Sequence, residues 1–150
     1  MKIAALAASA RRPESEVEWE DLLVRIEVMP RALRVLLEGV DGSDPTVRAL
    51  LADLLRREAF ASDFLERAAG HPGEPQTMPT QEDAVERFVR LRTRNFAMMQ
   101  RRGIDVWEWE AEIAGGGTAS VYQLLSALAA GDVDLLAALR GFSGTGSGAC

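Results

Sequence analysis

Apolar residues recur every three or four positions in four stretches of the chain, and polar, glycine-rich or proline-rich residues separate these stretches. The apolar stripes run over residues 19–37, 47–68, 85–99 and 121–139. This spacing places the apolar side chains on one side of an α-helix, whereas a half-buried strand requires strict alternation. The pattern therefore predicts four amphipathic helices and no β-strand.

Residues that favour the first turn of a helix stand directly before each stripe. A Ser or Thr followed three residues later by a Glu, Gln or Asp resembles the capping box, in which side chains bond the free backbone N–H groups of the first turn. An Asp before a Pro is a second start signal, because Pro suits the first helical position. The four signals are Ser15 with Glu18, Asp44 with Pro45, Thr80 with Asp83, and Ser120 with Gln123.

Pro30 interrupts the first stripe. A proline inside a helix cannot donate a hydrogen bond to the carbonyl four residues earlier, so we expect this helix to be kinked or broken near Met29. Turn residues in 39–45 and 70–79 mark connections, and 103–114 is expected to be irregular or briefly helical. The glycines at 115–117 are interpreted as a linker into the Ser120 cap.

These elements predict an all-α four-helix bundle with one long crossover connection. We expect an N-terminal extension over 1–14, the bundle over 15–141, and a flexible glycine- and serine-rich tail over 142–150.

Composition narrows the class of protein. The net charge of −6 argues against non-specific binding to nucleic acid. The single cysteine, Cys150, excludes an intramolecular disulfide and favours a cytoplasmic setting. The first residues imitate a signal peptide, but their apolar run is at the short limit for one, and no membrane span is expected.

The fourth stripe contains a glycine, Gly131, at a position that faces the bundle interior. A glycine inside a helix costs about 1 kcal/mol relative to alanine, so its presence needs an explanation. The surrounding segments resemble the DinB/YfiT-like superfamily of four-helix bundles. The resemblance rests on "PTVRALLADLLRREAFASDFLERA", on "FVRLRTRNFAMM" and above all on "GTASVYQLLSALAAGDVDLLAALR", and it covers about residues 15–141.

The resemblance implies a metal site that this chain does not complete. Family members with metal activity carry one histidine in the second helix and an H-x-x-x-H pair in the fourth, and they include thiol transferases and hydrolases. The corresponding positions hold Asp53, Gly131 and Leu135 here. We therefore expect no zinc or nickel, and instead a cavity at the former metal site lined by Asp53, Gly131, Asp132, Leu135 and Trp107.

Carboxylates could hold a different metal, but Asp132 and Asp134 are two residues apart and point to opposite sides of a helix. We expect a solvated Asp134 and an Asp132 at the edge of the bundle. For Asp53 we expect a structural ion pair with Arg92 or Arg94 from the third helix.

Other candidate groups carry weaker signals. Trp107 and Trp109 could line a pocket or a subunit interface, or close the end of the core. His71, the single histidine, lies in the 70–79 loop and is expected to be solvated.

The sequence favours a protein that binds a small apolar ligand or acts in assembly, and that forms a homodimer through its broad apolar helix faces. The alternative is a metal-dependent thiol transferase or hydrolase with a non-standard site.

Overall fold

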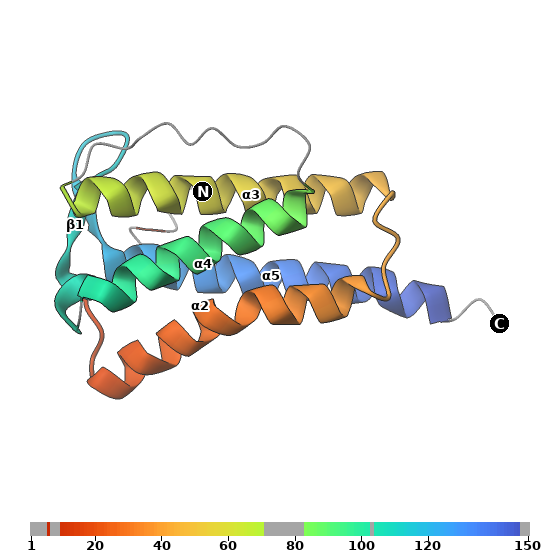
Figure 1. The fold of residues 1–150 in the computed structure, drawn as a ribbon, viewed down its shortest axis with the longest axis horizontal. Helices are drawn as coiled ribbons and strands as arrows, with labels where there is room; N and C mark the ends of the chain where they lie inside the picture. Colours follow the sequence, from red (N-terminus) through yellow and green to blue (C-terminus); the bar gives the residue numbers. More distant parts are fainter. Residues whose placement is uncertain (1–5, 7–9, 71–82, 103, 148–150) are drawn as a thin grey trace.

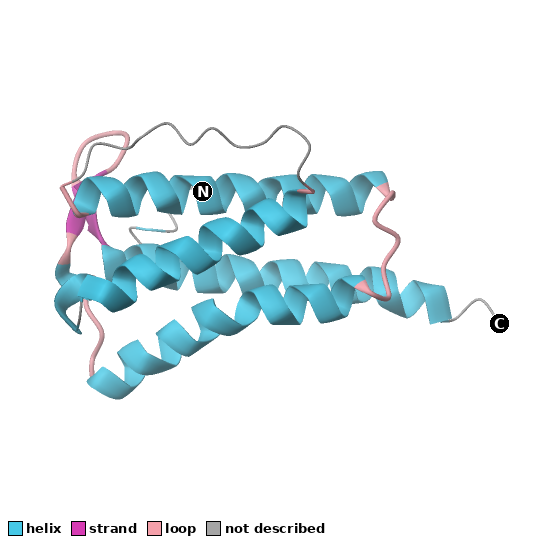
Figure 2. Cartoon of the chain, viewed as in Figure 1, coloured by secondary structure: helices cyan, strands magenta, loops and turns pink. Residues whose placement is uncertain are grey.

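The computed structural model describes residues 6, 10–70, 83–102 and 104–147, and most of them are helical (Figures 1 and 2). The long helices are α2 (Glu16–Leu37), α3 (Pro45–Ala68), α4 (Ala84–Arg102) and α5 (Val121–Ser147). A short 3-10 helix, η1 (Ile104–Glu108), and two strands, β1 (Glu110–Glu112) and β2 (Thr118–Ser120), lie between α4 and α5. The expectation of a helical fold built on four long helices is confirmed for the described residues.

The four helices form a bundle in which α2 and α3 each pack against both α4 and α5. The pairs α2/α3 and α4/α5 therefore lie diagonally across the bundle. Figure 1 shows that α3 and α4 run in the same direction. The end of α3 and the start of α4 therefore lie at opposite ends of the bundle, and the expected crossover between them falls mostly outside the described residues.

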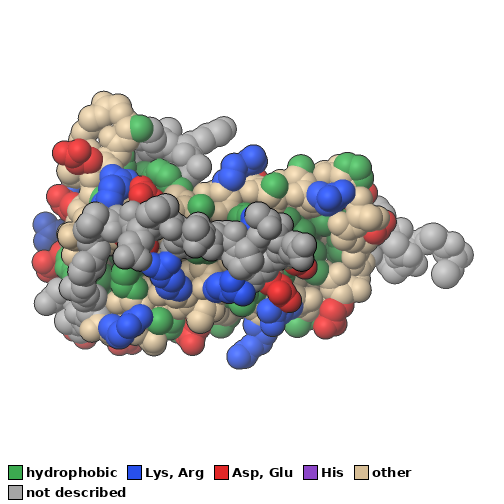
Figure 3. Space-filling model, turned by 45° about the horizontal axis from the view of Figure 1, so that its top comes forward, with side chains coloured by type: hydrophobic (Ala, Val, Ile, Leu, Met, Phe, Trp, Pro, Cys, Tyr) green, Lys and Arg blue, Asp and Glu red, His purple; other side chains and the backbone are tan. Residues whose placement is uncertain are grey.

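The interior holds two apolar clusters, one toward each end of the bundle. The cluster nearer the strands draws on Trp19, Ile26, Phe64, Leu65 and Leu125 among others. The cluster nearer the other end consists of Met29, Leu33, Val47, Leu51, Leu54, Phe88, Leu135 and Leu139. Charged side chains of both signs lie on the outer surface, as Figure 3 shows for one face.

The expected start signals of α2, α3 and α5 are confirmed, whereas α4 begins at Ala84, directly after Asp83. Ser120 and Gln123 form a reciprocal capping box: the Ser120 hydroxyl accepts from the Gln123 N–H at 3.2 Å, and the Gln123 side chain accepts from the Ser120 N–H at 2.9 Å. Asp44 caps α3 by accepting from two backbone N–H groups, and the Ser15 hydroxyl accepts from the Glu18 N–H. Thr80 and His71 lie outside the described residues.

The expectation that no strand exists is wrong. β1 and β2 form an antiparallel hairpin in which Ala111 faces Ala119. The glycines 115–117 are its turn, and all three have positive φ, which favours glycine. Strands of three residues are too short to show the alternation that identifies a strand in a sequence.

The helix with Pro30 is kinked rather than broken, which is one of the two expected outcomes, whereas the end of α5 differs from expectation. α2 continues through Pro30 without a break, although it bends near its middle (Figure 1). α5 continues to Ser147, so the expected tail from 142 is helical up to that residue, while 148–150 lie outside the described residues. Extending an existing helix costs less than nucleating one, which explains why glycines and serines continue it.

Part of the N-terminal extension packs on the bundle. Leu6 is fully buried in the cluster near the strands, and its carbonyl accepts from the Gln123 side chain at 3.2 Å. The Ser120 hydroxyl donates to the Arg11 carbonyl at 2.6 Å. The start of α5 therefore anchors the described part of the extension.

By length and composition, the segment Val121–Phe142 of α5 qualifies as a candidate membrane span, which the sequence analysis did not anticipate. More than half of that segment is buried inside the bundle, and the core helix of a globular protein passes the same test.

Candidate functional site

A layer of polar side chains crosses the bundle between the two apolar clusters. Burying ionised groups is costly unless each one finds partners, so such a layer requires a specific arrangement. α3, α4 and α5 all contribute to it. Its members are Glu58, Ser62, Arg92, Asn95 and Asp132, each no more than 5% exposed.

Arg92 is the centre of this layer. Its Nε donates to Glu58 Oε2 at 2.9 Å. Its two terminal nitrogens bind both oxygens of Asp132, at 2.9 and 3.2 Å. This two-point contact uses the planar fork of the guanidinium, which a lysine cannot reproduce. The Phe88 ring lies against the same guanidinium, 4.9 Å from its central carbon to the ring centroid.

A chain of hydrogen bonds completes the Glu58 side of the layer. The Asn95 side-chain amide donates to Glu58 Oε1 at 3.0 Å, and the Ser62 hydroxyl donates to the Asn95 carbonyl oxygen at 3.0 Å. Both oxygens of Glu58 are thus bonded, and so are both oxygens of Asp132. The layer is internally satisfied, which removes most of the cost of burying its polar groups.

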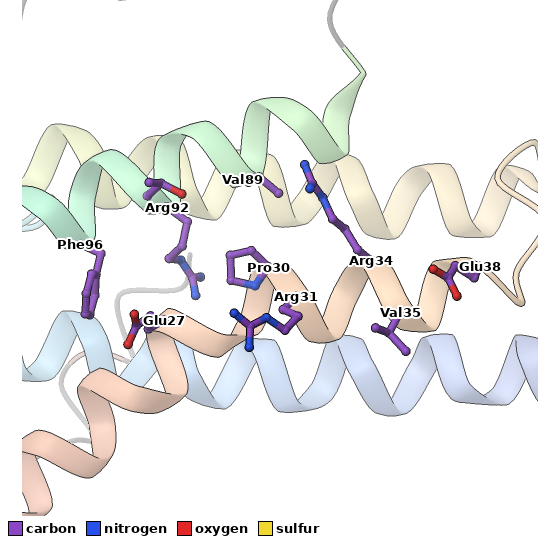
Figure 4. A pocket seen from close by; sticks show the side chains of 10 residues that line it. Glu27, Pro30, Arg31, Arg34, Val35, Glu38, Val89, Arg92 and Phe96 are labelled. Carbon is purple, nitrogen blue, oxygen red and sulfur yellow. The ribbon is translucent and has the colours of Figure 1, made fainter.

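The bend in α2 takes part in this layer. Because Pro30 has no N–H, the carbonyl of Ile26, four residues earlier, loses its helical partner. Arg92 donates to that carbonyl at 3.1 Å. Figure 4 shows the Arg92 side chain reaching from α4 toward α2 beside Pro30. One guanidinium therefore bonds groups from α2, α3 and α5 at once.

The layer holds two carboxyl groups around one guanidinium, and this imbalance affects Glu58. Burial raises the pKa of the Glu58 carboxyl above its ordinary value, although Arg92 and Asn95 oppose the change. The nearby Asp132 carboxylate raises the pKa further. Burial lowers the pKa of Arg92, but the two carboxylates outweigh it and raise that pKa overall.

The ion pairs differ from those expected. Arg92 pairs with Glu58 and Asp132, and Arg94 pairs with Glu66, so neither pairs with Asp53. Asp53 is exposed and pairs within its own helix, with Arg56 at 3.5 Å and Arg57 at 3.6 Å.

Asp132 is also not at the bundle edge but buried in its centre, whereas Asp134 is exposed as expected. The sequence analysis missed Glu58 altogether. Its position four residues after Leu54 and three before Ala61, inside an apolar stripe, was the available signal.

Gly131 makes room for an arginine. A Cβ built at position 131 would lie 1.6 Å from Nη1 of Arg57, so the guanidinium lies directly over this glycine. The Arg57 side chain is only 12% exposed. Its Nε and Nη1 are buried, and neither atom has a hydrogen-bond partner among the described residues. Gly131 therefore has a packing role: it admits a second cation next to the polar layer.

The three residues that the DinB/YfiT-like resemblance assigns to metal positions fit a metal poorly. Asp53 offers one exposed carboxylate, Gly131 offers no ligand atom, and Leu135 packs in the apolar cluster. The cation Arg57 lies between the first two. Among the described residues, no three His, Cys, Asp or Glu side chains are grouped so that they could hold a metal ion.

The five residues expected to line a cavity are only partly brought together. Asp53 and Gly131 both adjoin Arg57, and Asp132 follows Gly131 into the polar layer. Trp107 packs against the cluster nearer the strands, whereas Leu135 belongs to the other one. Trp107 and Trp109 both pack against the cluster nearer the strands and help to close the core at that end.

A groove lies between α2 and α4 on the outer side of Arg92 (Figure 4). Its volume of about 440 Å³ falls in the range of small-molecule pockets. Two acidic side chains, Glu27 and Glu38, also line it. The remaining lining residues are Pro30, Arg31, Arg34, Val35, Val89, Arg92, Thr93 and Phe96.

The raised pKa of Glu58 predicts a specific pH dependence. Folded Glu58 holds a proton more readily than unfolded Glu58, so its contribution to stability is fully present below its ordinary pKa of 4.5. It is lost as the pH rises through the raised value. We expect the stability of the wild type relative to Glu58→Gln to fall as the pH rises above 4.5, measured by urea unfolding. A difference that rises with pH would contradict this assignment.

The packing of Arg57 on Gly131 predicts a non-additive pair of substitutions. Gly131→Ala should stabilise the protein by about 1 kcal/mol when Arg57 is replaced by Ala, because alanine favours the helix. In the presence of Arg57 it should stabilise less or destabilise, since the guanidinium must move. Gly141 on the same helix has open space around it. Gly141→Ala is the control, and its effect should not depend on Arg57.

Comparisons of the chain with known proteins leave its family undetermined. No family model, no curated protein and no solved structure matches it significantly. The resemblance to the DinB/YfiT-like superfamily therefore stays an expectation from the motifs in its helices. The polar layer, the Arg57 position and the groove are consequently interpreted from their own geometry.

Proposed function

We propose that this protein is a DinB/YfiT-like bundle without metal chemistry, which binds a small molecule in the groove between α2 and α4. The single observation that supports a bundle without metal chemistry is the position of Arg57. A guanidinium over Gly131 puts a fixed positive charge where a metal ion would need free space and neutral or anionic ligands. A metal at that place would first have to displace Arg57.

The chemistry of the groove suggests the kind of ligand. Pro30, Val89 and Phe96 provide apolar surface, and Arg31 and Arg34 stand at its rim (Figure 4). Neither of these arginines has an ion-pair partner within the described part of the chain. An apolar body with one acidic group satisfies both features, because an anionic group can form charge-assisted hydrogen bonds with these exposed guanidinium groups.

The competing function is a metal-dependent transferase or hydrolase, and metal binding separates the two. We expect dialysed wild-type protein to bind no stoichiometric zinc. The substitutions Asp53→His, Gly131→His and Leu135→His should create a zinc site only when Arg57→Ala is added, because the guanidinium otherwise remains over position 131. Equilibrium dialysis measures zinc binding by the wild type and by the histidine variants. Tight zinc binding by the wild type would overturn the proposal.

Ligand binding can be tested with 8-anilinonaphthalene-1-sulfonate, which combines aromatic rings with one sulfonate. We expect saturable binding by the folded wild type, detected by fluorescence. Thr93→Trp should block the groove, and Arg34→Glu should weaken binding by about tenfold, equivalent to 1.4 kcal/mol.

The control for this experiment is Arg48→Glu, which reverses an exposed arginine on α3 away from the groove. Circular dichroism should show the same helical content in all variants. Binding that is unchanged in Thr93→Trp and Arg34→Glu would place the probe elsewhere and refute the groove as the site.

A further inference from the structure

α2 has a second apolar face that nothing in the described structure covers. The exposed large apolar side chains of the described residues are all valines, and four of the five lie on this helix. They are Val17, Val24, Val28 and Val35, which are between 46% and 74% exposed. Exposed apolar side chains that form a continuous stripe usually mark an interaction surface.

The four valines share one side of the helix. At 100° per residue their directions fall within about 20° of a common line. The residues that α2 buries in the bundle, such as Leu22, Ile26 and Leu33, point to the opposite side. α2 is therefore apolar on two opposite faces, and the core explains only one of them.

Two charged residues complete the stripe. Positions 17, 21, 24, 28, 31 and 35 are spaced alternately by four and three residues, which is the spacing of a two-helix seam. In this order they read Val, Asp, Val, Val, Arg, Val. Read in reverse, the order differs only in that Asp and Arg exchange places. Two such stripes in antiparallel directions therefore place valine against valine and Asp against Arg.

We propose that α2 docks against α2 of a second copy of this chain in the antiparallel direction. With the two-fold axis midway between Val24 and Val28, Val17 lies opposite Val35 of the second copy. Val24 then lies opposite Val28, and Asp21 lies opposite Arg31. A parallel pair would instead bring Asp21 against Asp21 and Arg31 against Arg31, which is unfavourable.

The surroundings of these two charges agree with this direction. Arg31 has no ion-pair partner within the described residues, so its charge is available to a second copy. Asp21 pairs with Arg25 at 3.2 Å, but both side chains are more than 60% exposed, and such surface pairs contribute little.

The stripe also extends to a neighbouring helix. Val133 of α5, the fifth exposed valine, lines a groove of about 350 Å³ between α2 and α5. Asp21 and Arg25 line the same groove from α2, and Ala129 and Ala130 line it from α5. The small side chains of Ala129 and Ala130 leave space for the edge of the docked helix.

Charge reversal tests both the surface and its direction. Sedimentation or light scattering at high micromolar concentration should give twice the 16.3 kDa of one chain for the wild type. Asp21→Arg and Arg31→Asp should each weaken the dimer by about tenfold or more, because like charges then face each other. The double variant Asp21→Arg/Arg31→Asp should restore it.

Arg48→Asp, a charge reversal on α3, is the control and should leave the dimer intact. A wild type that stays monomeric would overturn the proposal, and so would single variants that dimerise as well as the wild type. The measurement uses no ligand, so it does not depend on the groove between α2 and α4.

Cross-linking tests the register. In a Cys150→Ser background, a mixture of Val24→Cys and Val28→Cys chains should form the mixed disulfide in preference to either symmetric one. Preference for the symmetric disulfides would indicate the parallel arrangement and refute this register.

Discussion

The guanidinium of Arg92 links all four long helices. It lies on α4, binds carboxylates from α3 and α5, and donates to a backbone carbonyl of α2. That carbonyl is free only because Pro30 cannot donate to it. The bend in α2 and the buried arginine therefore satisfy each other. Apolar packing on both sides is not directional, whereas the hydrogen bonds of this layer are directional and join specific positions on the four helices.

A second arginine, Arg57, lies beside this layer and pairs with Asp53 on its own helix. Glu58 and Asp132 outnumber Arg92, and Arg57 brings another positive charge to the neighbouring position over Gly131. A glycine is poor for a helix, but any larger residue would occupy the space of that guanidinium. The Arg57 guanidinium also adjoins Asp53 and Gly131, two of the positions that the DinB/YfiT-like resemblance assigns to metal ligands, and the proposal of a bundle without metal chemistry rests on this placement.

The surfaces proposed for ligand binding and for assembly both involve α2. Its bend opens the groove toward α4, where apolar side chains and arginines lie together. Its outward face carries the valine stripe. In an antiparallel pair of these stripes, Asp21 of each copy would face Arg31 of the other. Arg31 and Val35 belong to both surfaces, so a docked second copy would form one side of the groove. The ligand-binding groove and the dimer interface would then adjoin each other.

The sequence by itself determined the helices, because their signals are local. The stripes, the Asp44–Pro45 start and the Ser120–Gln123 capping box act within a few residues. The hairpin was missed because three residues cannot show a period. The partners of Arg92 were missed because Glu58 and Asp132 lie 34 and 40 residues away from it. Only the tertiary structure brings them together, since a buried charge selects its partner by geometry across helices, and no spacing along the chain encodes that geometry.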